Sequence, residues 1–92
     1  MRTTVVGLVT PHLLRVIELA NEAQKGKNVD WHLRDTVART MNELADHFNA
    51  QALVASYIEG LENAAQQAPR AREDYIRILQ AAAAAARNLR RD

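Results

Sequence analysis

The chain has 92 residues, no cysteine and a formal net charge of +1 at pH 7. A chain of this length forms one domain with a modest core, and without cysteine it has no disulfide bond, thiol nucleophile or cysteine-ligated zinc site. Hydrophobic residues make up 48% of the chain but aromatic residues only 4%, so alanine supplies much of the apolar share and closely packed helices are favoured.

The N-terminal stretch TTVVGLV is rich in β-branched residues and contains a glycine, which predicts an extended arm over residues 1–10. Thr10 followed by Pro11 is typical of a helix N-cap with proline in the first helical position. We therefore predict a first helix at 11–25. Its apolar side comprises Leu13, Leu14, Val16, Ile17, Ala20 and Ala23.

Asp30 is in position to cap a second helix at 31–48. An apolar stripe of period 3.6 follows it, made of Leu33, Val37, Met41, Leu44, Ala45 and Phe48. The stripe then loses phase, which indicates a break near Asn49 and a third helix at 50–67.

Pro69 separates the third helix from a fourth at 70–90, which ends in the sequence QAAAAAARNLRRD. On a helical wheel this helix carries an apolar arc over about half of its circumference. Ala81 and Ala84 point away from that arc, which contains Tyr75, Ile76, Ile78, Leu79, Ala82, Ala83, Ala85, Ala86 and Leu89. Residues 11–92 are thus predicted to form a single all-α, four-helix bundle-like domain, with an arc wide enough to favour a homodimer.

The segment from Glu43 to Leu61, ELADHFNAQALVASYIEGL, looks like a helix-turn-helix. The chain has no arginine or lysine from position 43 to 69, and the would-be recognition helix carries Glu59 and Glu62. Binding to DNA draws on phosphate neutralisation by basic side chains. An ordinary pair of core helices is therefore the favoured interpretation of this segment.

Charge is unevenly distributed along the chain. Residues 30–63 hold two arginines against six carboxylates, whereas residues 70–92 hold six arginines against three carboxylates. Such poles can meet within one chain, across a homodimer or with another molecule. The residues predicted to contact an anionic partner are Arg77, Arg87, Arg90 and Arg91.

No pattern in the chain predicts catalysis. Glu43 and His47 share a helix face at a spacing of four, but no second ligand pair accompanies them, and His12 and His32 fit surface or capping positions. The chain has no glycine-rich phosphate loop and no nucleophile with a matching base. We therefore expect no catalytic residue, metal or cofactor, and the chain is not expected to be an enzyme.

The sequence favours a small helical protein-protein interaction module: an adaptor, inhibitor or regulator. The residues predicted to form its partner or dimer interface are Trp31, Tyr57, Tyr75, Ala82, Ala83, Ala86 and Leu89. The alternative is a nucleic-acid-binding transcriptional regulator that uses residues 43–61 or the basic C-terminal helix. Phage and mobile-element products, antitoxins and secretion chaperones often have this size and build, which is a class-level analogy.

Neither a bilayer-spanning apolar run nor a signal peptide is recognisable in the sequence. We therefore expect a cytoplasmic protein without a membrane partner.

Overall fold

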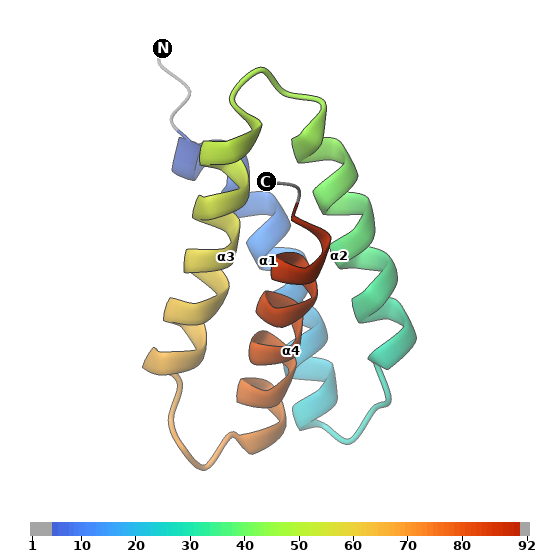
Figure 1. The fold of residues 1–92 in the computed structure, drawn as a ribbon. Coiled ribbons are helices and arrows are strands. Elements are labelled where there is room, and N and C mark those ends of the chain that lie inside the picture. Colours follow the sequence, from blue (N-terminus) through green and yellow to red (C-terminus); the bar gives the residue numbers. More distant parts are fainter. Residues whose placement is uncertain (1–4, 91–92) are drawn as a thin grey trace.

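A computed structural model describes residues 5–90 and folds them into an all-α bundle (Figure 1). The helices are α1 (Val5–Gln24), α2 (Asp30–Ala45), α3 (Ala50–Gln67) and α4 (Glu73–Leu89). Successive helices are antiparallel and are joined by short loops. The prediction of an all-α four-helix bundle is confirmed, with no strand anywhere in this described range.

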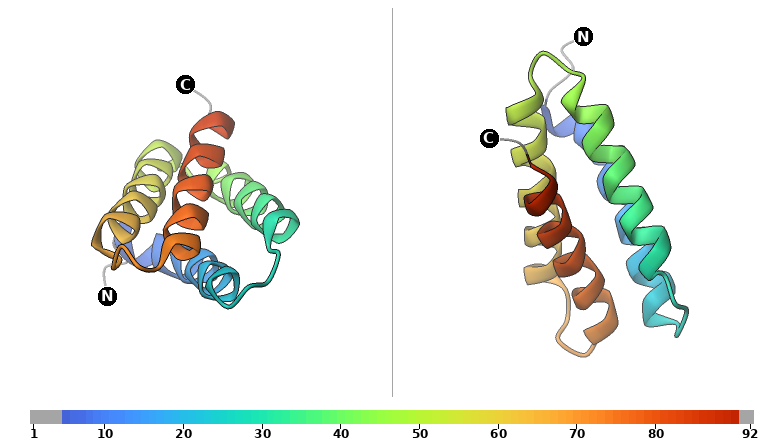
Figure 2. Two further views of the ribbon diagram at one scale, coloured as in Figure 1. Left: turned by 90° about the horizontal axis from the view of Figure 1, so that it is seen from below. Right: turned by 45° about the vertical axis from the view of Figure 1, so that its right-hand side comes forward.

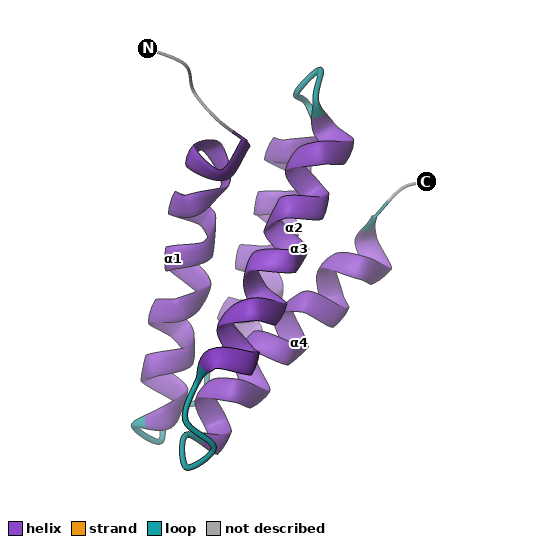
Figure 3. Ribbon diagram, turned by 90° about the vertical axis from the view of Figure 1, so that its left-hand side faces the viewer, coloured by secondary structure: helices purple, strands orange, loops and turns teal. Residues whose placement is uncertain are grey.

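The four helices are not packed equally. α1 and α4 lie against each other in the middle of the bundle, with α3 on one side and α2 on the other (Figure 2). α4 packs closely on both α1 and α3, whereas α2 makes the least extensive contacts with the other helices. α4 is also inclined to its neighbours, so that its C-terminal end diverges from α1 (Figure 3). α2 and α3 therefore stand apart on either side of α4, and near the loop that joins them α4 no longer lies between them (Figure 1).

The prediction of an extended arm is wrong for residues 5–10, which form the first turns of α1; residues 1–4 lie outside the described range. Val9 is completely buried in the core. Its burial outweighs the weak preference of β-branched residues for extended structure. Thr10 is inside the helix and does not cap it, because its hydroxyl donates a 2.7 Å hydrogen bond to the Val6 carbonyl. Pro11 is likewise inside the helix.

The second helix ends earlier than predicted. α2 stops at Ala45, and Phe48 lies in the four-residue loop 46–49 with its side chain fully exposed. The predicted continuation of the core stripe through Ala45 and Phe48 is therefore wrong. The chain reverses direction after Leu44, the last buried residue of α2, so that α3 can place its own apolar face on α1 and α4.

The start of α2 also differs in its cap. Asp30 is the first helical residue and makes no capping bond from its side chain. The Asn28 side-chain oxygen instead accepts a hydrogen bond from the Asp30 backbone N–H at 3.1 Å. Asn28 thus satisfies one of the backbone donors that every helix leaves unpaired at its N-terminus.

The core combines large side chains with the alanines of α4. Its completely buried hydrophobic residues are Val9, Val16, Ala20, Val37, Leu53, Tyr57, Leu61, Ile78, Leu79, Ala82 and Ala86. Ala81 and Ala84 are exposed, which agrees with the predicted phase of the alanine run. The run therefore continues the buried face of an amphipathic helix.

Gly60 explains how closely α1 approaches α3. A Cβ atom built at this position would lie 2.6 Å from Leu13 Cδ1, well inside van der Waals contact. The absence of a side chain at Gly60 therefore makes room for Leu13. This packing role offsets the cost, about 1 kcal/mol relative to alanine, of a glycine inside a helix.

Candidate protein-binding groove

One end of the bundle is fastened by polar side chains. We call it the closed end; it comprises the loops at 25–29 and 68–72 with the adjoining turns of α1 and α4. Arg72 Nη2 donates a 2.6 Å hydrogen bond to Asn21 Oδ1, and the Arg72 guanidinium lies 4.1 Å above the Tyr75 ring. The Tyr75 backbone N–H donates to Gln24 Oε1 at 3.1 Å. These contacts connect α1 to the start of α4.

An ion pair at the same end joins α1 to the loop that follows it. Lys27 Nζ lies 2.8 Å from Glu22 Oε2. The hydrogen bond from Lys27, together with its positive charge, lowers the pKa of Glu22, and the same pairing raises the pKa of Lys27. Gly26 makes the turn with φ of 98°, a conformation that glycine adopts without strain.

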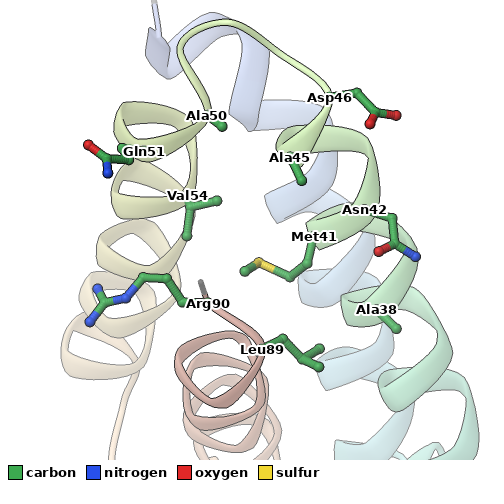
Figure 4. A pocket seen from close by; sticks show the side chains of 10 residues that line it. All are labelled: Ala38, Met41, Asn42, Ala45, Asp46, Ala50, Gln51, Val54, Leu89 and Arg90. Atoms are coloured by element: carbon green, nitrogen blue, oxygen red, sulfur yellow. The ribbon is translucent and has the colours of Figure 1, made fainter. Parts of the chain in front are cut away.

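At the opposite end a groove opens between α2 and α3, with the C-terminal end of α4 at its base (Figure 4). Its volume is about 850 Å³, within the range of pockets that hold ligands. Met41 and Val54 face the space between the helices, whereas Asp46 and Gln51 point outward at the rim. The complete lining is Ala38, Met41, Asn42, Ala45, Asp46, Ala50, Gln51, Val54, Leu89 and Arg90. The interior of the groove is thus apolar and its rim polar.

Exposed hydrophobic side chains are concentrated at this same end. We call it the open end; it comprises the first turn of α1, the loop 46–49, the last turn of α4 and the groove. Among residues 5–90, the large exposed hydrophobics are Val6, Leu8, Leu14, Trp31, Phe48 and Leu89. All but Leu14 and Trp31 lie at the open end. Phe48, at 102% relative exposure, is the most exposed of the six.

The predicted interface residues are not brought together. Four of them, Tyr57, Ala82, Ala83 and Ala86, are buried in the core of the chain itself. Contacts within one molecule cover these side chains, which leaves them no surface for a partner, and this part of the interface prediction is corrected.

The other three predicted interface residues lie in different places. Trp31 is 70% exposed, packs edge to face on His32, and stands at the start of α2, far from the groove. Tyr75 is half-buried under Arg72 at the closed end. Leu89 lines the groove.

The basic residues predicted to meet an anionic partner contact carboxylates of their own chain. Both oxygens of Glu62 accept hydrogen bonds from Arg87 Nη2, at 2.8 and 2.7 Å. Arg77 lies between Asp74 and Asp30, at 3.6 and 3.9 Å. Two of the predicted arginines therefore connect the basic α4 to acidic residues of the same molecule. Arg90 lines the groove, and Arg91 lies outside the described range.

The histidines are dispersed. His12 Nε2 on α1 lies 3.6 Å from Glu43 Oε2 on α2, so Glu43 faces His12 of another helix. His47 is exposed in the loop 46–49. Over residues 5–90 no group of three or more acidic or histidine side chains is arranged to hold a metal ion.

The segment 43–61 does not have the geometry of a helix-turn-helix. Its two parts belong to α2 and α3, which run antiparallel as a hairpin (Figure 1). The helices of a DNA-binding helix-turn-helix instead cross at about 90–120°. The loop between them here is part of the open end.

The core contains two buried hydroxyl groups, those of Thr40 on α2 and Tyr57 on α3, which lie next to each other. Neither makes a well-formed hydrogen bond among the described residues. Burial raises the pKa of Tyr57 to about 12, and the neighbouring Thr40 hydroxyl offsets only part of that effect. Both hydroxyl groups therefore belong to the core and not to the groove, whose lining includes neither residue.

Most groove residues were not singled out from the sequence. Met41 and Ala45 belong to the predicted core stripe of the second helix, and only Leu89 and Arg90 are predicted at a binding surface. The loss of phase near Asn49 indicates the position of the loop beside the groove but not the groove itself.

Comparisons with protein-family models, with curated proteins and with solved structures gave no match. None of the helices in the described range is long and apolar enough to cross a membrane.

Proposed function

We propose that this protein is a non-catalytic, cytoplasmic helical module that binds a protein partner through the groove at its open end. The observation that carries the proposal is the apolar groove between α2 and α3, with exposed large hydrophobics on the same end of the bundle. An apolar centre inside a polar rim is the usual anatomy of a protein interface. Concentrated exposed apolar surface likewise marks interaction sites on soluble domains.

The shape of the groove favours a helical or aromatic element of the partner. Two nearly antiparallel helices form its walls, and an amphipathic helix can place its apolar face between such walls. Met41 in the interior suits this role, because the unbranched and polarizable methionine side chain adapts to differently shaped partners.

The nucleic-acid alternative has weaker support. Arg77 and Arg87 pair with carboxylates of their own chain, and an anionic ligand would have to displace those partners. The acidic character of α3 also opposes approach to a phosphate backbone.

Site-specific photo-crosslinking in cells tests the proposal. A photoreactive phenylalanine analogue is placed at Ala45 in the groove wall and, as a matched control, at Gln67, which is exposed at the other end of α3. We expect a discrete covalent protein adduct from the groove position and none from the control. Equal labelling from both positions, or none from either, would contradict a binding groove.

A further inference from the structure

We propose that a second copy of this chain occupies the groove, in a two-fold homodimer in which Phe48 of each copy inserts between α2 and α3 of the other. The inference rests on the proposed function, since it names the partner of the same groove. It moves the expected dimer contact from the buried alanine face of α4 to the open end.

Phe48 has the properties of an inserting side chain. It is completely exposed, although burying a phenylalanine side chain in an apolar site is favourable. Asp46 and Ala50 on either side of it line the groove, but Phe48 itself does not. The exposed ring therefore belongs to the loop beside a groove that it leaves unfilled in its own molecule.

A two-fold contact requires one patch to carry both complementary shapes, because residue i of one copy meets residue j of the other and the reverse. The open end meets this condition, since Phe48 and the groove occupy the same end. Trp31, the other strongly exposed aromatic side chain, stands at the far end of α2 and does not.

The interior of the groove fits an aromatic ring. Met41, Val54 and Leu89 supply aliphatic surface, and a methionine sulfur makes favourable contacts with aromatic rings. The volume of about 850 Å³ accommodates a phenyl ring together with neighbouring backbone. Leu89, half-exposed in the single chain, would then be covered.

The charges of the groove allow two copies to approach each other. Its lining carries one acidic residue, Asp46, and one basic residue, Arg90. Two identical surfaces with no net charge meet without the like-charge repulsion that disfavours self-association.

Sedimentation equilibrium on the full chain, over a range of protein concentrations, tests the proposal. We expect a reversible monomer-dimer equilibrium in which Phe48→Ala raises the dissociation constant by about tenfold or more. Trp31→Ala is the matched control, because it removes an exposed aromatic ring from the opposite end and is expected to leave dimerisation unchanged. Circular dichroism melting at low concentration should give the same monomer stability for both variants, since both side chains are exposed.

Crosslinking between single-cysteine variants tests the geometry, because the natural chain has no cysteine. His47→Cys, which places the thiol beside Phe48 and keeps the ring, should form a crosslinked heterodimer with Ala45→Cys through a short bifunctional maleimide. His47→Cys mixed with Gln67→Cys should not, because Gln67 lies at the other end of α3.

The outcomes separate this inference from the proposed function. A monomer at every concentration, or a dimer that survives Phe48→Ala, overturns the homodimer. If the probe at Ala45 then captures a different protein, the binding groove stands and its occupant is foreign. Absence of any adduct at Ala45 overturns both.

Discussion

The two ends of the bundle are completed in different ways. At the closed end, Arg72, Asn21 and Gln24 tie the loops to the helices with side-chain hydrogen bonds, and the Tyr75 ring lies under a guanidinium. At the open end, a four-residue loop carries an exposed phenylalanine beside an apolar groove. Polar groups at the closed end thus pair with each other within the chain, whereas the open end exposes apolar side chains to solvent.

The two ends therefore have different expected roles. The closed end stabilises the fold, and the open end carries the proposed binding groove. α4 supplies buried residues from Ile78 to Ala86 and packs against the other three helices. The helices at the open end are therefore packed around α4, although that end exposes apolar side chains. Met41 and Val54 belong both to the core and to the groove wall. Phe48 and Leu89 are exposed, so substitutions at these two positions test the proposed groove with little effect on the core.

The largest effect is expected where α4 supports the open end. Ala86 is completely buried, whereas Ala84, two residues earlier, is exposed. We expect Ala86→Glu to lower the free energy of unfolding by more than about 3 kcal/mol, because it overpacks the core and buries an unpaired charge. Urea unfolding monitored by circular dichroism measures it.

Ala84→Glu is the matched control, with an expected change within about 0.5 kcal/mol. If Ala86→Glu were equally well tolerated, the last turns of α4 would not be packed into the bundle. The open end would then be poorly packed.

A second experiment tests whether the buried Tyr57 hydroxyl is shielded from water. Burial raises the pKa of Tyr57 to about 12, whereas an unfolded tyrosine ionises near pH 10. The folded state therefore binds more protons between these values, and the free energy of unfolding falls as pH rises from 10 towards 12. This contribution amounts to about 2 to 3 kcal/mol at the upper limit.

Tyr57→Phe removes this ionisation. Below pH 10 we expect it to be as stable as the natural chain or slightly more so, since the Tyr57 hydroxyl lies beside the Thr40 hydroxyl without a well-formed hydrogen bond. Above pH 10 the advantage of the variant should grow, as measured by urea unfolding at successive pH values. Parallel pH profiles for the two proteins would mean that water from the groove reaches the hydroxyl.

The smallest effect is expected at the closed end. Arg72→Ala removes the hydrogen bond to Asn21 and the cation over Tyr75, which should cost about 1 kcal/mol and speed amide exchange in the loop 68–72. Arg70→Ala removes the same charge from an exposed neighbouring position. If both variants lowered the free energy of unfolding equally, the loss would be due to net charge. The side-chain contacts of Arg72 would then add little to the stability of the closed end.

Segments with a clear 3.6-residue hydrophobic period predicted the helices that they form and the side of each helix that is buried. α3 has the expected bounds of 50–67, and the alanine run faces the core in the predicted phase, because a 3.6-residue pattern directly encodes which side of a helix is buried. Local propensity failed at 5–10, where β-branched residues suggested an extended arm. Burial of Val9 depends on tertiary contacts that no local pattern contains.

The candidate site was harder to predict for a related reason. Phe48 continued the spacing of Leu44 and was assigned to the core, since periodicity does not reveal where a chain reverses. Tyr57 and the alanines of α4 were assigned to an interface, because the number of neighbours that cover a wide apolar arc depends on how four helices pack. The groove depends on the inclination of α4, which has no signature in the sequence.

The alanine run of α4 also has an evolutionary consequence. The small side chains of Ala82, Ala83 and Ala86 are buried against the other helices. Valine and glycine codons are each one nucleotide away from an alanine codon. A point mutation at these positions would therefore change the spacing of the helices, and with it the width of the groove, without altering any residue that lines the groove.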